Sequence, residues 1–283
     1  MSSFSNLRGK VAVVTGGASG IGKGTARQLI AEGMHVVIAD VERDALERTA
    51  AELGAVGIHT DVSDLESVRA LSRSVVDRFG TVHVVCNNAG VGPIAKVSDL
   101  RIEDWHWMLG VNLYGVIHGV QTFLPILKAN ADGGHIVNTA SIFGLFANPP
   151  LAAYSVSKYG VVALTEALAV ELAEEDSKVG VTVLCPSTVQ TNVANSTRNR
   201  PECYRNGALS DFEMSKEEYE SYRWLTPDEA GAIVVRAITR GDLYAITHPE
   251  SYSPLIEQRH RNIAAAFERA AVLEREAEAV GTP

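Results

Sequence analysis

The stretch Val11-Ala12-Val13-Val14-Thr15-Gly16-Gly17-Ala18-Ser19-Gly20-Ile21-Gly22 places a glycine-rich turn directly after a short apolar run. Gly16, Gly20 and Gly22 allow a tight turn, a close approach of the backbone to a pyrophosphate and close packing of a helix on a strand. The residues that follow open a helix, whose first N–H groups have no partner within the helix and attract anions. The spacing Gly-x-x-x-Gly-x-Gly differs from the commoner Gly-x-Gly-x-x-Gly fingerprint, so the turn by itself fits a structural role as well as a dinucleotide site.

Short apolar runs rich in β-branched residues recur along the chain, with helix-like stretches between them. We expect strands over Lys10–Thr15, His35–Asp40, Val56–Thr60, Val82–Asn87, His135–Ala140, Val181–Cys185 and Leu243–Thr247. Unbroken apolar runs are typical of strands buried on both faces, and their alternation with helices indicates a parallel sheet covered on both sides. The expected fold is an α/β, Rossmann-type doubly wound parallel sheet. No repeat or proline-rich linker divides the chain, so residues 1–283 are expected to form a single dinucleotide-binding and catalytic domain.

The composition argues against several classes of function. With 283 residues, of which 46% are hydrophobic, the chain can bury a full core. Its apolar stretches are far shorter than the roughly twenty residues that cross a bilayer, and the N-terminal residues do not resemble a secretory signal, so we expect no membrane span and a cytoplasmic location. The net charge of −9 argues against a nucleic-acid partner. Three widely spaced cysteines and eight histidines without metal-ligand spacing predict reduced thiols and no bound metal.

Acidic residues follow two of the expected strands. Asp40 ends the second one, 18 residues after Gly22, where a carboxylate can accept hydrogen bonds from the adenosine ribose and repels a 2′-phosphate. We therefore expect NAD rather than NADP, although Arg43 offsets part of this charge. After the third strand, Asp61-Val62 is placed to meet the adenine, but an aspartate there is equally suited to cap a helix.

A tyrosine and a lysine four residues apart, Tyr154 and Lys158, follow Ser141 in the chain. Such a pair is common on helices, but its position downstream of the glycine-rich turn predicts an enzyme that moves hydride to or from a dinucleotide. Oxidation of a secondary alcohol releases a proton, and a free tyrosine, with a pKa of about 10, accepts protons poorly at neutral pH. Lys158 lies one helical turn away, where its positive charge favours the phenolate.

Together these motifs resemble the short-chain dehydrogenase/reductase family from about Leu7 to Thr247. The resemblance also includes Asn87-Asn88-Ala89-Gly90 after the fourth expected strand, Asn112 within a long helix, and Ser141 after the fifth strand. One departure is Pro186-Ser187 after the sixth strand, where the family usually has Pro-Gly. Because serine restricts the backbone, the family's nicotinamide-side geometry transfers less directly to the residues that follow.

The resemblance implies roles for four catalytic residues, Asn112, Ser141, Tyr154 and Lys158. Tyr154 acts as acid and base, and Ser141 bonds the substrate oxygen and stabilises the charge that develops there. Lys158 also bonds the nicotinamide ribose, and Asn112 holds a water that links Lys158 to solvent; by residue type alone, Asn112 is better explained as a buried amide at a helix kink. The implied cofactor contacts are Gly16, Ser19, Gly20, Ile21, Gly22, Asp40, Asp61, Val62, Asn88, Ala89, Gly90, Tyr154, Lys158, Pro186, Val189 and Thr191.

Within the family, the similarity is greatest to dehydrogenases that oxidise the benzylic alcohol of lignin-derived β-aryl ethers. It lies in Gly134–Ser141, Asn199–Glu202 and Leu243–His248. None of these stretches clearly reads a substrate. Between the catalytic serine and tyrosine, the residues Phe143, Phe146, Asn148 and Pro149 are expected to border the substrate, which suits a hydrophobic and aromatic alcohol.

Three further segments carry expectations about assembly and motion. Trp105–Leu127 and Leu151–Leu172 are helix-like with apolar residues around most of their circumference, which favours a subunit interface over simple deep burial. The family resemblance implies a homodimer or homotetramer built through these helices. Residues 192–225 are polar and are expected to form either a mobile substrate lid or a solvated loop. Residues 253–280 are expected to form an amphipathic helix that packs on its own subunit or on a neighbour.

The leading prediction is an NAD-dependent oxidoreductase that interconverts a small or medium hydrophobic secondary alcohol and its ketone. An NADPH-dependent carbonyl reductase is an alternative that Asp40 disfavours. A non-catalytic, dinucleotide-binding regulatory protein is another, but the set Ser141, Tyr154, Lys158 and Asn112 argues against it because binding alone needs no phenol base.

Overall fold

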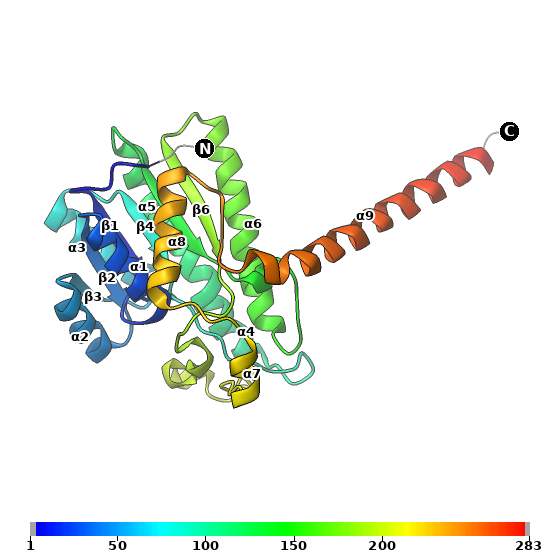
Figure 1. Ribbon diagram of the computed structural model, residues 1–283, viewed down its shortest axis with the longest axis horizontal. Coiled ribbons are helices and arrows are strands. Elements are labelled where there is room, and N and C mark those ends of the chain that lie inside the picture. Colours follow the sequence, from blue (N-terminus) through cyan, green and yellow to red (C-terminus); the bar gives the residue numbers. More distant parts are fainter. Residues whose placement is uncertain (1–3, 281–283) are drawn as a thin grey trace. The chain divides into compact units, whose positions relative to one another are not determined.

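The computed structural model describes residues 4–280, and the sheet in this part of the chain has seven strands in the order β3-β2-β1-β4-β5-β6-β7. The strands are β1 Val11–Thr15, β2 His35–Asp40, β3 Val56–His59, β4 Val84–Asn87, β5 Gly134–Thr139, β6 Val179–Cys185 and β7 Tyr244–Ile246. All neighbours pair in parallel. Each expected run contains or overlaps a strand, and the predicted doubly wound parallel sheet is confirmed (Figure 1).

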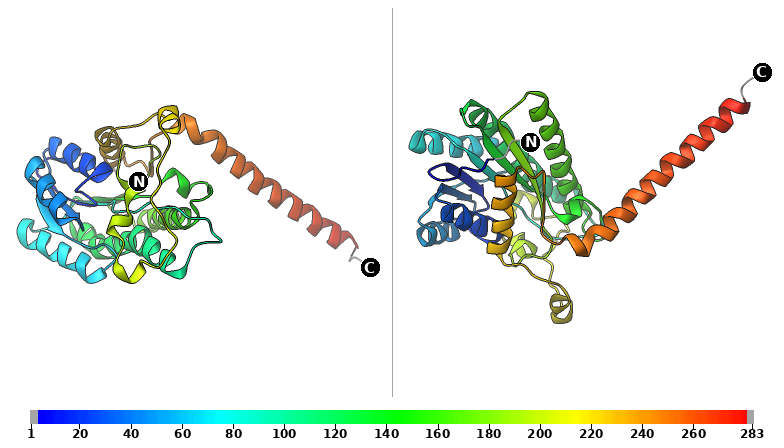
Figure 2. Two further views of the ribbon diagram at one scale, coloured as in Figure 1. Left: turned by 90° about the horizontal axis from the view of Figure 1, so that it is seen from below. Right: turned by 45° about the horizontal axis from the view of Figure 1, so that its top comes forward.

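Helices cover both faces of this sheet, as the views in Figure 1 and Figure 2 show. The α-helices that precede β7 in the chain are α1 Gly20–Ala31, α2 Arg43–Leu53, α3 Leu65–Phe79, α4 Ile102–Leu109, α5 Gly115–Ala129, α6 Ala152–Glu174, α7 Lys216–Ser221 and α8 Pro227–Arg240. Along β1, Val11 and Val13 join one buried cluster, whereas Ala12 and Val14 join another. This alternation explains why the strand reads as an unbroken apolar run.

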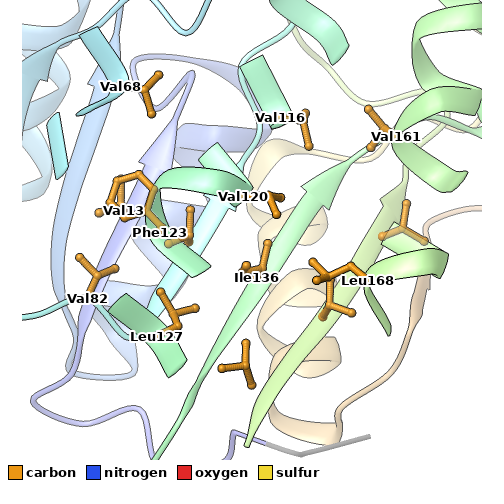
Figure 3. Close-up of a cluster of buried hydrophobic side chains, with 14 of the residues drawn as sticks. Val13, Val68, Val82, Val116, Val120, Phe123, Leu127, Ile136, Val161 and Leu168 are labelled. Carbon is orange, nitrogen blue, oxygen red and sulfur yellow. The ribbon is translucent and has the colours of Figure 1, made fainter. Parts of the chain in front are cut away.

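The larger cluster lies between the sheet and α3, α5 and α6 (Figure 3). Val13 and Ile136 project from the strands, and Phe123 and Leu127 project from α5 toward them. All four side chains are fully buried or nearly so. The second cluster joins the opposite face to α1, α2 and α8. With both faces buried, the carboxyl edge of the sheet is where functional side chains can reach solvent.

One predicted helix is interrupted. The expected helix Trp105–Leu127 consists of α4, a π-helical turn at Gly110–Tyr114, and α5. A π turn replaces the i→i+4 hydrogen bonds with i→i+5 bonds, and such turns recur at functional sites. Asn112 lies in the middle of this turn and is fully buried.

The chain divides into two compact units at Thr247. The first unit contains the whole seven-stranded sheet, and the single domain over residues 1–283 stays a prediction. The second contains α9, Pro249–Val280, which includes the predicted 253–280 helix and begins four residues earlier. Among residues 4–280, no helix is both long enough and apolar enough to cross a membrane.

Candidate active site

The glycine-rich turn lies at the carboxyl end of β1, between β2 and β4, where the strand order reverses. Ligands of open α/β sheets bind at such a switch point. Gly16 and Gly20 have φ of 64° and 50°, which favours glycine. A Cβ on Gly16 would lie 2.8 Å from the Cα of Ala89, so a side chain there would close the space over β4. Glycine therefore lets this turn, called the cradle below, pack directly against the segment after β4.

The start of α1 is open toward this cradle. Ser19 occupies the N-cap position, but its hydroxyl makes no capping hydrogen bond, so it is available to a ligand. Ile21 packs against the small cluster of Val189, Leu225 and Ala230. A Cβ on Gly20 would lie 2.9 Å from Cγ2 of Thr191. The stretch after β6, which contains the predicted cofactor contacts Val189 and Thr191, therefore borders the glycine-rich turn.

The Asn88-Ala89-Gly90 segment is tied to the end of β1. The N–H groups of Asn88 and Ala89 donate to Thr15 Oγ1 at 2.9 Å and 3.1 Å, and Asn88 Nδ2 donates to the Thr15 carbonyl at 3.0 Å. A Cβ on Gly90 would lie 3.2 Å from Asn112 Oδ1 and 3.5 Å from Lys158 Nζ. Gly90 thus leaves room beside two of the predicted catalytic side chains.

Asp40 ends β2 with its carboxylate turned toward the glycine-rich turn. Its Oδ2 accepts from the N–H of Ala18 at 3.0 Å, and its Oδ1 accepts from the N–H of Glu42 at 3.0 Å. Burial raises the pKa of Asp40 above its usual value, and the two N–H bonds oppose this rise. Each carboxylate oxygen keeps a further lone pair, so the group can still accept bonds from ribose hydroxyls.

Asp61 and Val62 follow β3 as expected, but the N-cap of the next helix, α3, is Asp64. Asp64 caps α3 by accepting from Glu66 N–H, whereas Asp61 accepts from the N–H and the hydroxyl of Ser63. The helix-cap alternative for Asp61 is therefore wrong. Val62 is buried beneath Gly115 of α5.

Ser141, Tyr154 and Lys158 come together beside the carboxyl end of β5. Ser141 follows β5, accepts from Phe143 N–H at 3.2 Å, and also hydrogen-bonds to the side chain of Tyr154. Lys158 Nζ lies 5.6 Å from the centroid of the Tyr154 ring. The residues of the predicted Tyr-x-x-x-Lys motif thus share one face at the start of α6.

The pKa shifts of Tyr154 and Lys158 favour a neutral phenol and not the expected phenolate. Burial raises the pKa of Tyr154 above its usual value, and the hydrogen bond with Ser141 lowers it only in part. Burial also lowers the pKa of Lys158 to about 8, while its ammonium donates to the Thr139 carbonyl at 2.9 Å. With its pKa raised, the phenol keeps its proton at neutral pH, and the Lys158 ammonium is directed to the Thr139 carbonyl.

Asn112 is held by the backbone of Val91. Its Oδ1 accepts from Val91 N–H and its Nδ2 donates to the Val91 carbonyl, both at 2.8 Å. Its Nδ2 also lies 3.3 Å from Ser157 Oγ. These bonds fasten the π turn to the segment after β4, which matches the reading of a buried amide at a helix kink.

The backbone after β6 accommodates the unusual serine. Ser187 N–H donates to Thr247 Oγ1 at 3.0 Å, and its φ lies outside the left-handed region. The Pro186 carbonyl accepts from Ile142 N–H at 2.9 Å and from Ser141 Oγ at 3.4 Å. Pro186 thus supports the loop that carries the predicted catalytic serine.

Apolar side chains surround the phenol. Tyr154 packs against a buried cluster that includes Trp107, Met108 and Leu209. Phe143 and Phe146 have ring centroids 5.3 Å apart, whereas Asn148 and Pro149 are exposed. An uncharged, apolar ligand suits this environment.

Sequence reasoning missed two contributors. The Thr15 hydroxyl organises the Asn88 loop, and the Thr139 carbonyl holds Lys158. Thr15 opens the glycine-rich stretch, but its hydroxyl was given no role there, and no local signal marked the Thr139 carbonyl. Within residues 4–280, no group of three or more histidine, cysteine or acidic side chains is placed to hold a metal ion.

Comparisons with known proteins show the family of this chain. A family model described as short chain dehydrogenase matches residues 10–202. The C alpha-dehydrogenase of Sphingobium sp. is 32% identical over 253 residues, covering 87% of this chain and 82% of that protein. The crystal structure of a short-chain dehydrogenase/reductase from Burkholderia phymatum in complex with NAD is 36% identical, with a TM-score of 0.85, covering 93% of this chain and 97% of that one.

A third relative is described with a derivative of NADP. The structure of an alcohol dehydrogenase from the archaeon Thermococcus sibiricus complexed with 5-hydroxy-NADP is 30% identical, with a TM-score of 0.70, and covers 84% of this chain and 95% of that one. The chain therefore belongs to the short-chain dehydrogenase/reductase family of oxidoreductases, as its motifs predicted, and within that family it is similar to a C alpha-dehydrogenase.

Proposed function

We propose that this protein is an NAD-dependent alcohol dehydrogenase that interconverts a hydrophobic, aromatic secondary alcohol and its ketone, with Tyr154 as acid and base. The observation that carries this proposal is the juxtaposition of Tyr154 with Ser141 and Lys158 in an apolar environment. A phenol bonded to a serine hydroxyl, with an ammonium nearby, is a proton-transfer arrangement that dinucleotide binding alone does not require.

The protein's own residues have distinct tasks in this reaction. Bound NAD supplies the hydride acceptor. Ser141 orients the substrate oxygen, and Tyr154 exchanges a proton with that oxygen. Because its pKa is raised, Tyr154 is protonated at neutral pH and is ready to act as the acid in ketone reduction. Lys158 holds its proton at neutral pH, since its pKa is about 8, and can favour the phenolate when its ammonium turns from Thr139 toward the phenol.

Cofactor contacts are proposed on the cradle described above. The turn at Gly16, Gly20 and Gly22, with the free hydroxyl of Ser19, suits a pyrophosphate. Asp40 supports NAD over NADP because a 2′-phosphate beside its carboxylate would be repelled. The Burkholderia relative is described with NAD and the Thermococcus relative with an NADP derivative, so the preference rests on Asp40.

The aromatic substrate class has two supports. One is the similarity to a C alpha-dehydrogenase. The other is the apolar cluster around Tyr154, together with the paired Phe143 and Phe146 rings in the loop between Ser141 and Tyr154. We also propose a homodimer or homotetramer through α5 and α6, since Tyr114 of the adjoining π turn and Val156 and Val170 of α6 are exposed. The three free thiols support the proposal of a cytoplasmic location.

Part of segment 192–225 is proposed to move as a substrate lid. Residues 212–224 include the exposed helix α7 and the stacked pair Tyr219 and Trp224, with ring centroids 4.4 Å apart. Limited proteolysis with and without NAD and substrate tests this. Protection of 212–224 on binding is expected, and unchanged cleavage would contradict a lid.

The direct test of the function is NADH formation by the purified protein with NAD or NADP and a panel of aliphatic, benzylic and steroid secondary alcohols. Turnover of benzylic alcohols with NAD, lost in Tyr154→Phe while NADH binding persists, is the expected result. Activity restricted to NADP would overturn the argument from Asp40. NADH binding without turnover of any alcohol would favour the regulatory alternative.

A further inference from the structure

An ion pair joins the segment after β6 to the loop after β2. Arg198 Nη2 lies 2.6 Å from Glu42 Oε1, and Asn199 Nδ2 donates to the same oxygen at 2.9 Å. Burial would raise the pKa of Glu42, but the bonds from Arg198 and Asn199 outweigh it, so the pKa lies below its usual value. Two neighbouring side chains therefore converge on one carboxylate about 156 positions away in the chain.

Glu42 stands next to the predicted ribose site. Its backbone N–H donates to Asp40 Oδ1, and the other oxygen of Asp40 accepts from Ala18 in the phosphate turn. A continuous set of hydrogen bonds thus runs from the glycine-rich turn through Asp40 and Glu42 to Arg198. The adenosine side of the cofactor site is connected in this way to a segment that begins on the nicotinamide side.

The same segment also borders the catalytic residues. Ser196 Oγ accepts from Gly92 N–H at 3.2 Å, and a Cβ on Gly92 would lie 3.0 Å from Val193 Cγ2. Farther along, Leu209 joins the apolar cluster that contains Tyr154. The turns Val193–Asn195 and Thr197–Asn199 lie between these contacts and Glu42 (yellow-green in Figure 1).

Two ion pairs hold this segment, and they differ in burial. Arg200 and Asp104 are 2.6 Å apart, with side chains 6% and 0% exposed, and Asp104 also accepts from the N–H groups of Ala208 and Leu209. The Arg198 and Glu42 side chains are 36% and 33% exposed. A partly exposed pair is screened by salt and breaks readily, whereas a buried pair with additional hydrogen bonds stays closed.

We propose that Glu42 is a positioning residue that fastens residues 192–199 beside the ribose end of the cofactor site through Arg198 and Asn199, so that dinucleotide release requires these bonds to break. We call Glu42, Arg198 and Asn199 the latch. The Arg200–Asp104 pair keeps the rest of the segment in place when the bonds of the latch break. This inference deepens the proposed function and rests on it, because the latch acts on bound dinucleotide.

The test is the rate of NADH release, followed by stopped-flow fluorescence. Arg198→Ala is expected to release NADH about two- to fivefold faster than the wild type, and Asn199→Ala to accelerate release less. The matched control is Arg205→Ala, since Arg205 pairs with Glu202 inside the segment and both side chains are well exposed. Its release rate should equal that of the wild type. Rising salt should accelerate release from the wild type but not from Arg198→Ala.

A double-variant cycle separates the latch from direct contact with the cofactor. Glu42→Ala and Arg198→Ala should each accelerate release, and the double variant should be no faster than the faster single variant. Additive effects, or a wild-type release rate in both Arg198→Ala and Asn199→Ala, would overturn the latch and leave the dehydrogenase proposal intact. Failure of the wild type to bind NADH would instead remove the proposed function itself. Circular dichroism confirms that each variant is folded.

Discussion

The ammonium of Lys158 donates to the carbonyl oxygen of Thr139 at 2.9 Å, so a buried positive charge ends on a strand carbonyl and not on a carboxylate. Lys158 is 3% exposed, and burial lowers its pKa to about 8. Keeping this charge in the folded protein costs free energy below that pH. The cost comes from burial, which takes the ammonium out of water.

The pH dependence of stability should show this cost. Folded Lys158 loses its proton near pH 8 and the unfolded residue near 10.5, so between these values the unfolded state binds more protons. The free energy of unfolding from this group should therefore rise with pH, by about 2 kcal/mol between pH 7 and pH 9.5. Urea denaturation at both pH values measures it. Lys158→Met is the control and should lack this increment, and an equal increase in both proteins would contradict the shifted pKa.

The Tyr154 phenol should remain protonated in the cofactor-free protein well above neutral pH. Burial raises its pKa beyond the usual value, and the bond with Ser141 only partly offsets this. The ultraviolet difference spectrum between wild type and Tyr154→Phe should show this residue less than half ionised at about pH 10. Ser141→Ala removes the lowering hydrogen bond and should delay the titration further. Phenolate at pH 8 without cofactor would mean that Lys158 alone activates the tyrosine.

Alanine substitutions at two glycines with the same φ distinguish the cost of backbone strain from the cost of steric crowding. Gly16 and Gly54 both have φ of 64°, but an added Cβ meets Ala89 at Gly16 and nothing within 4 Å at Gly54. Both alanine variants carry the strain of a left-handed residue, on the order of 1 kcal/mol. Gly16→Ala should lose a further ~1–3 kcal/mol and bind NADH weakly, because the cradle narrows. Thermal denaturation and NADH titration measure the two effects. Equal losses at both positions would show that crowding over β4 is unimportant.

Cofactor preference should depend on Asp40. Asp40→Asn removes the negative charge and keeps an oxygen that can accept from Ala18 N–H. The ratio of kcat/KM for NAD to that for NADP should fall at least about tenfold, because the repulsion of a 2′-phosphate is lost. Asp77→Asn is a suitable control, since that carboxylate is exposed on α3 and belongs to none of the predicted cofactor contacts. An unchanged ratio in Asp40→Asn would place the discrimination elsewhere.

Much of this molecule was determined by the sequence alone. The apolar runs predicted the parallel sheet because a strand buried on both faces needs apolar side chains at every position, as Val11 to Val14 show. The glycine-rich turn and the Tyr154–Lys158 pair predicted the family because their geometry is local: a turn, and one helical turn of α6.

Only the tertiary structure decided how distant residues meet. The contact of Lys158 with Thr139, the bonds of Asn112 with Val91, and the bonds of Arg198 and Asn199 with Glu42 all join segments separated by many residues. Their existence depends on strand order and on the path of the segment after β6, which no local pattern encodes. The pKa values of Tyr154 and Lys158 were also decided by the tertiary structure, because burial shifts them and burial is a property of the folded chain.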